Sequence, residues 1–193
     1  MRFIRLLLPT LLLMAGCSTL SQTTPCVTCE PSYTLRHPDM NYTEFIKRAD
    51  DMVKENYPEW YVEDLAQELE LEQLGALFAS VDIQEDGTLL VTIYEKSWDL
   101  CTVEDFASVL LHEYVHAKIW FQLEEEIEDE WCRAAMHEVT AYNVELTQTK
   151  INVTSAMLSG TEFGYRFAYI RAMTYCPREA YASFPAPGTA YNR

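Results

Sequence analysis

The feature that most constrains this chain of 193 residues is an apolar stretch, Phe106 to Phe121, with three ionisable side chains at its centre. The stretch is apolar nearly all round, so we expect a buried helix. His112, Glu113 and His116 interrupt it, and burying them without partners would cost several kcal/mol. A divalent cation would satisfy both histidines, and a water in the same cavity would satisfy the glutamate.

These three residues have the H-E-x-x-H spacing. Residues four apart lie one above the other on a helix, so His112 and His116 can each direct a ring nitrogen at one ion about 2.0–2.1 Å away. Glu113 is rotated by roughly 100° around the helix. It would therefore lie beside the ion, where a general base can take a proton from bound water.

A third ligand is expected on a second helix, predicted for Asp129 to Thr149. We choose Glu138, because its face of that helix carries an apolar stripe with small residues that let a neighbouring helix approach. The stripe consists of Trp131, Ala134, Ala135, Ala141 and Tyr142. His137 has polar neighbours and should face outward; it and Glu145 are the alternative third ligands.

The remaining patterns predict an α+β fold that is mostly helical, with a small antiparallel hairpin before the motif helix. Asp86-Gly87, between alternating apolar residues, indicates that hairpin. It offers an edge to which an extended peptide could add, or it simply covers the core. The motif helix should begin after Thr102 and end near Gln122, followed by a solvated acidic loop. The other expected elements are helices over 41–56, 60–74 and 155–175 and strands over 77–84 and 88–95.

The N-terminal sequence predicts that the protein is exported. Residues 1–16 combine Arg2 and Arg5 with an apolar run. Met14-Ala-Gly-Cys17 resembles the lipobox of bacterial lipoprotein precursors, which implies cleavage before Cys17 and lipid attachment to Cys17. Ser18, directly after this cysteine, resembles the sorting signal that sends lipoproteins to the outer membrane, on its periplasmic side, in hosts with two membranes. Residues 17–40 would then be a tether, residues 41–176 the folded domain, and residues 177–193 a tail.

The charge excludes some partners. Loss of Arg2 and Arg5 would leave 12 basic and 30 acidic residues, a formal charge of −18. Phosphate repels such a surface, so nucleic acid is not expected as a partner. An anionic membrane would repel it too, so the lipid must hold the protein there. The oligomeric state stays open.

Five cysteines would remain after lipidation, namely Cys26, Cys29, Cys101, Cys132 and Cys176. If the two central helices are antiparallel, Cys101 and Cys132 lie at opposite ends, too far apart for a disulfide. Cys101 with Cys176, or one of them with the tether pair, fits better.

The motif followed by Glu138 on a second helix resembles the gluzincin group of zinc metallopeptidases. The resemblance implies a zincin-like fold, Zn²⁺ held by His112, His116 and Glu138, and Glu113 activating a zinc-bound water against a peptide carbonyl. It also implies a tyrosine, histidine or arginine that stabilises the oxyanion, for which residues 155–175 offer several tyrosines and arginines. Gluzincins often have an acid four residues after the third ligand, hydrogen-bonded to the first histidine. Tyr142 stands there, so another group must orient His112.

Two functions follow. The first is a lipid-anchored zinc endopeptidase that acts on proteins or peptides of the bacterial envelope, with wall peptides as a variant of the substrate. The second is a non-catalytic, zinc-stabilised lipoprotein that acts as a binding or assembly module. Glu113 favours the enzyme, because a closed structural zinc site needs no base and usually adds a fourth ligand.

Overall fold

The computed structural model describes residues 40–63, 65–70, 78–94, 97, 99–100, 102–147 and 150–188. The predicted signal peptide, Cys17 and almost all of the tether lie outside them, as do residues 189–193. The helices are α2 (Tyr42–Asn56), α3 (Val103–Glu126), α4 (Glu130–Thr147), α5 (Ser155–Tyr175) and the short α6 (Arg178–Tyr181). The strands are β1 (Ala66–Glu70), β2 (Ala79–Ile83) and β3 (Leu89–Tyr94). The α+β class with mostly helical content is confirmed.

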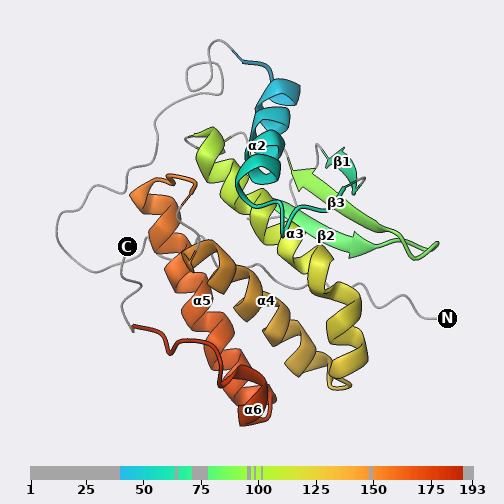
Figure 1. Cartoon of the computed structure of the whole chain (residues 1–193), viewed down its shortest axis with the longest axis vertical. Coiled ribbons are helices and arrows are strands. Elements are labelled where there is room, and N and C mark those ends of the chain that lie inside the picture. The colour runs from blue at the N-terminus through green and yellow to red at the C-terminus, as the bar shows by residue number, and fades with distance from the viewer. Residues whose placement is uncertain are drawn as a thin grey trace.

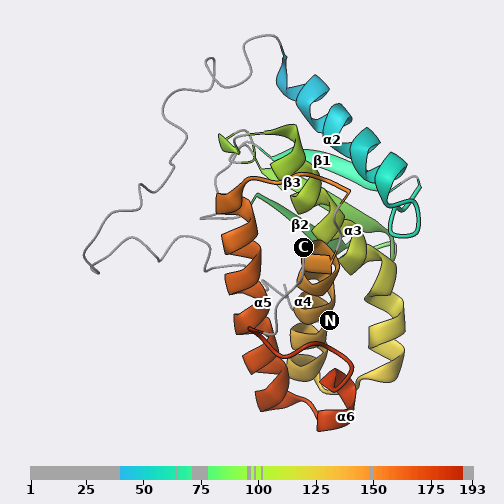
Figure 2. The ribbon, with the colours of Figure 1, turned by 60° about the vertical axis from the view of Figure 1, so that its left-hand side comes forward.

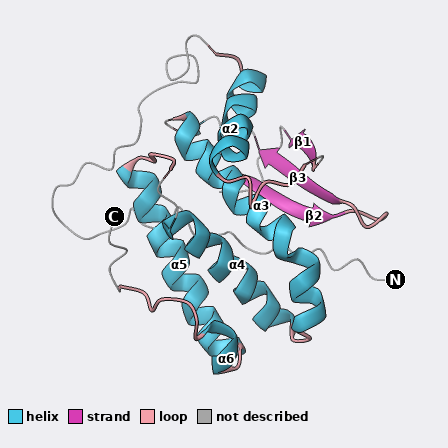
Figure 3. Cartoon of the chain, in the orientation of Figure 1, coloured by secondary structure: helices cyan, strands magenta, loops and turns pink. Residues whose placement is uncertain are grey.

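The elements are arranged around α3. On one side of it α4 and then α5 follow as a layer of helices, while α2 and the sheet lie on its other side (Figures 1 and 2). Figure 3 shows how small the sheet is beside the helices. No helix in the described ranges is both long enough and apolar enough to cross a bilayer.

The predicted hairpin is confirmed. β2 and β3 pair antiparallel with Val81 opposite Val91. Gly87 adopts a φ of 86°, which favours glycine, and the Asp86 carboxylate accepts a hydrogen bond from the amide of Thr88 at 3.0 Å. Among the described strands the order is β1-β3-β2, so β2 is an edge strand.

The helix predicted over 60–74 is wrong. Residues 66–70 form β1, which pairs parallel with β3 from Ala66 opposite Leu90 to Glu70 opposite Tyr94. Without β1, the second edge of β3 would leave its N–H and C=O groups without sheet partners. A helical pattern in the sequence predicts a helix only weakly, and here pairing with a neighbouring strand outweighs it.

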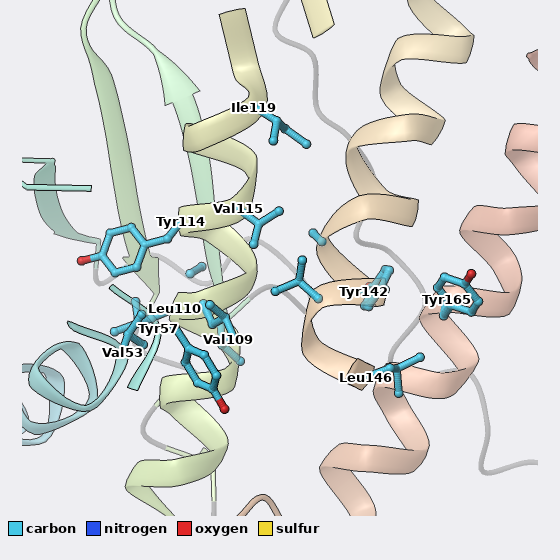
Figure 4. Packing of buried hydrophobic residues seen from close by; sticks show 14 of the residues in the cluster. Val53, Tyr57, Val109, Leu110, Tyr114, Val115, Ile119, Tyr142, Leu146 and Tyr165 are labelled. Carbon is cyan, nitrogen blue, oxygen red and sulfur yellow. The ribbon is translucent and has the colours of Figure 1, made fainter. Parts of the chain in front are cut away.

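The motif helix begins as predicted and ends later. Thr102 is the N-cap, and its hydroxyl accepts a hydrogen bond from the amide of Asp105 at 3.0 Å. α3 continues through Glu126, so the first part of the predicted acidic loop is helical, and only residues 127–129 separate α3 from α4. Because α3 is apolar nearly all round, it needs cover on every side, and α2, the sheet and α4 provide it. Figure 4 shows Val109, Leu110 and Val115 in this packing.

Helix α5 is held against α4 by a close packing contact. Tyr142 of α4 and Tyr165 of α5 lie between the two helices (Figure 4). A Cβ added to Gly164 would overlap the Tyr142 ring and come within 2.8 Å of its hydroxyl, so only glycine fits there without movement. Tyr165 donates a hydrogen bond to the carbonyl of Pro185 at 2.6 Å, which ties the C-terminal segment to α5.

A disulfide joins Cys132, near the start of α4, to Cys176, just after α5. The predicted pairing of Cys101 with Cys176 is therefore wrong; Cys101, Cys26 and Cys29 lie outside the described residues. α4 and α5 are antiparallel neighbours, so the start of one meets the end of the other, with 4.8 Å between the two Cα atoms. Cys132 and Cys176 meet only because α5 returns along α4, a tertiary contact that the spacing of the cysteines does not indicate.

Replacing Gly164 by alanine should destabilise the protein. Helix propensity alone predicts a gain of about 0.5–1 kcal/mol for this change. The overlap with Tyr142 should outweigh the gain and give a net loss of roughly 1–3 kcal/mol, measured by denaturant unfolding. Ser159→Ala, at an exposed position of the same helix, is the control. A more stable Gly164→Ala variant would contradict the packing described here.

The disulfide can be mapped directly. Proteolysis without reductant should yield one linked peptide pair that contains Cys132 and Cys176. Because the bond closes a loop of 44 residues, replacing both cysteines by serine should cost about 2–4 kcal/mol in the free energy of unfolding. Finding Cys176 linked to Cys101 instead would show that α4 and α5 pack differently.

Candidate metal centre

The structure brings His112, His116 and Glu138 together. Each offers one ligand atom, and these atoms all lie within 4.8 Å of one another. The Nε2 atoms of His112 and His116 are 3.6 and 3.7 Å from the two carboxylate oxygens of Glu138. These distances are too long for good hydrogen bonds but close to the roughly 3.3 Å that separates two ligands of a tetrahedral zinc ion. All three residues are buried.

The backbone explains how they meet. His112 and His116 stand one turn apart on α3, with ring centroids 4.6 Å from each other. The short reversal after α3 brings α4 back alongside it, and two fully buried alanines, Ala135 and Ala141, flank Glu138 in the α4 sequence. Small side chains allow two helices to approach closely, so the Glu138 carboxylate reaches both imidazoles.

Burial and charge set the protonation of this cluster. Burial raises the pKa of Glu138, but the neighbouring imidazoles His112 and His116 outweigh it and lower that pKa to about 2. Burial, together with the charge of His112, lowers the pKa of His116 well below its usual value. The carboxylate is therefore ionised and His116 is neutral at neutral pH, which are the forms that bind a metal.

Glu145 orients His112. The Nδ1–H of His112 donates to the Glu145 carboxylate at 2.9 Å, and the other oxygen of that carboxylate accepts from the Ser108 hydroxyl at 2.8 Å. Although burial lowers the pKa of His112, Glu138 and Glu145 outweigh it and raise that pKa well above the usual value. With Nδ1 occupied, Nε2 is left buried without a hydrogen-bond partner and is directed at the other two ligand atoms. A metal that replaces the proton on Nε2 would satisfy this atom.

The sequence predicts Glu145 only as an alternative third ligand. The structure places it behind His112, seven residues after Glu138 and so on the same face two turns along. Tyr142, at the position where gluzincins often have an acid, packs its ring edge-on against His112 with centroids 4.5 Å apart. The spacing of seven residues was the available signal for Glu145.

Glu113 is buried beside the cluster but is not part of it. Burial raises its pKa to about 7 against the opposing charge of His112, and the charges of Glu138, Glu145 and Asp82 raise it by smaller amounts. A carboxylate with a pKa near neutrality is suited to accept and return a proton at physiological pH. Asp82 belongs to β2, so the sheet edge lies near enough to influence this group.

The outward orientation predicted for His137 is wrong. Its side chain is buried, with its ring 5.3 Å from Trp120 and 5.5 Å from His116. Burial lowers its pKa to about 4. His137 is not among the three clustered residues, so its position gives no support to it as the third ligand. Trp120 and His116 of α3 lie against it, which the polar neighbours in its own sequence did not indicate.

The candidates for oxyanion stabilisation on α5 differ in position. Tyr165 is buried and already donates to Pro185, and Arg166 is exposed. Arg171 is partly buried, and its charge contributes to the lowered pKa of Glu138. The charge of Arg171 therefore connects this residue to the cluster.

Glu145→Gln should weaken zinc binding by about 10–100-fold, because the neutral amide is a poorer partner for His112. Zinc affinity can be measured by competition with a chromophoric chelator at pH 7. Glu124→Gln, at an exposed position of α3, is the matched control and should leave the affinity unchanged. Equal affinities for both variants would show that Glu145 does not support the ligand.

The site thus combines three convergent ligand atoms, a positioned first histidine and a buried glutamate with a pKa near neutrality. Such a set can hold a divalent cation and move a proton next to it. No protein-family model, curated protein or solved structure matches this chain. The case for a function therefore comes from the residues of the site.

Proposed function

We propose that this protein is a zinc-dependent peptidase with a zincin-like active site of the gluzincin type. The observation that carries the proposal is the convergence of His112, His116 and Glu138 beside the buried Glu113. Two histidines and a carboxylate form a common ligand set of catalytic zinc, which leaves one coordination position for water or substrate. The orphaned Nε2 of His112 fits such an ion.

Zn²⁺ bound there would lower the pKa of a water molecule and polarise a peptide carbonyl. Glu113 accepts the proton of the attacking water on its carboxylate and then delivers it to the leaving amine. Its raised pKa keeps this return of the proton possible near neutral pH. Glu145 holds the His112 ring in one orientation throughout, and Arg171 is the candidate for balancing charge that develops on the carbonyl oxygen.

The edge strand supports a peptide as substrate. Among the described strands β2 lies at one edge of the sheet, and Asp82 on it contributes to the raised pKa of Glu113. An extended peptide could pair with this edge through main-chain hydrogen bonds and pass beside Glu113. Binding through the main chain favours cleavage within a chain, which fits an endopeptidase.

The second candidate, a non-catalytic zinc-stabilised module, is less well supported. A structural zinc site normally has four protein ligands. Within the described ranges the cluster contains three. A buried Glu113 would also cost stability without serving such a site.

The proposed setting is the bacterial envelope, with the protein anchored by lipid on Cys17. Its support is the sequence of residues 1–17, which combines basic residues, an apolar run and a lipobox-like end. An anchor would keep the enzyme near envelope proteins and peptides despite its acidic surface.

Glu113→Gln should retain zinc and abolish cleavage of a mixed peptide library, because glutamine cannot accept the proton. We expect kcat/KM to fall by at least about 100-fold, the usual contribution of a general base. Glu124→Gln is again the control, and zinc content is measured on all samples. Full cleavage by a zinc-loaded Glu113→Gln variant would remove Glu113 from the mechanism. A wild-type protein that binds zinc but cuts no library member would favour the binding module.

A further inference from the structure

Helix α5 exposes an apolar face that nothing in the described structure covers. Phe163, Phe167, Ile170 and Met173 are 49%, 43%, 59% and 56% exposed. Their spacing places them on the side of the helix opposite Tyr165, Ala168 and Ala172, which are buried against the rest of the protein. Four large apolar side chains in a row on one helix mark an interaction surface rather than ordinary exposure.

The side chains on the outward face of α5 increase in size along the helix. Its N-terminal part carries the small, exposed residues Ser155, Ala156 and Ser159, and its C-terminal part carries the large ones. When two such helices pack antiparallel, the large side chains of each helix lie on the small side chains of the other. In a pair related by a two-fold axis level with Gly164, Ile170 lies over Ala156 and Ser159 of the second copy, and Phe163 packs near its own equivalent.

Charges beside the stripe have the same symmetry. Glu162 and Arg166 are exposed on one flank, and neither is in any of the ion pairs among the described residues. A two-fold axis places this flank of one copy beside the same flank of the other. Glu162 of each copy then meets Arg166 of the other, at the same register that fits the apolar residues. Closed dimers require a surface that is complementary to itself, and both size and charge meet this condition here.

We infer that this protein forms a homodimer through an antiparallel pairing of α5 with α5 of a second copy. The whole chain has a formal charge of −16, so two copies repel each other elsewhere and need a specific attractive surface. The same charge, with Glu162 beside the stripe, disfavours an anionic bilayer as the occupant. Four side chains on one helix cover less than the roughly 800 Å² per partner of a standard interface, so we expect a dimer that dissociates on dilution.

Charge reversal tests the register. Sedimentation equilibrium of the full chain in a density-matched detergent, over a range of concentrations, should show a monomer–dimer equilibrium. Glu162→Arg and Arg166→Glu should each weaken it by at least about tenfold, because each places like charges opposite one another twice. The double variant should restore dimerisation. Glu55→Arg and Lys118→Glu, exposed residues away from α5, make the same changes in net charge and should leave it intact.

The inference fails if the chain is monomeric at every concentration, if the single reversals match their controls, or if the double variant does not recover. Vesicles of phosphatidylcholine with phosphatidylglycerol provide a further arm. A monomer that binds them, and loses this binding on Phe167→Ser, would show that the stripe meets lipid instead. All variants change exposed residues, and thermal unfolding should confirm unchanged stability.

Discussion

The burial of ionisable side chains between α3 and α4 is the constraint on which the rest of this structure depends. His112, Glu113, His116, Glu138 and Glu145 are all buried, although each carries a charge in at least one protonation state. Leaving such groups without partners would cost several kcal/mol each. The protein offsets part of this cost internally, through Ser108, Glu145 and His112, and a cation at the three ligand atoms would offset much of the remainder. Stability and the proposed chemistry therefore depend on the same few residues.

The surrounding elements fix the spacing of the two helices. Tyr114, the residue after Glu113, donates a hydrogen bond to Asp50 of α2, which also accepts from Tyr61 at 3.1 Å. At the start of α3, the Asp105 carboxylate accepts from the amide and the hydroxyl of Thr154, which caps α5. Together with the disulfide at the opposite end of α4 and α5, these contacts hold the helices at both ends, so the ligand atoms keep their relative positions.

The local signals in the sequence predicted those features that depend on few residues. The N-cap Thr102, the hairpin at Asp86-Gly87 and the position of Glu138 beside the two histidines each follow from spacing or from turn chemistry, while the role of Glu138 as a metal ligand stays a prediction. The features that were predicted wrongly depend on tertiary partners. β1 is a strand because it pairs with β3, His137 is buried where Trp120 and His116 of α3 lie against it, and Cys176 pairs with Cys132 because α5 returns along α4. The role of Glu145 needed the relative rotation of α3 and α4, which no single helix pattern contains.

The central claim is that one zinc ion binds at His112, His116 and Glu138, and diffraction from crystals of the protein purified without chelator tests it most directly. Data collected on either side of the zinc absorption edge should give one anomalous peak about 2.0–2.2 Å from a nitrogen of each histidine and an oxygen of Glu138, with room for a fourth, non-protein ligand. A peak elsewhere, a fourth protein ligand in the open position, or no peak in protein soaked with zinc would contradict the account.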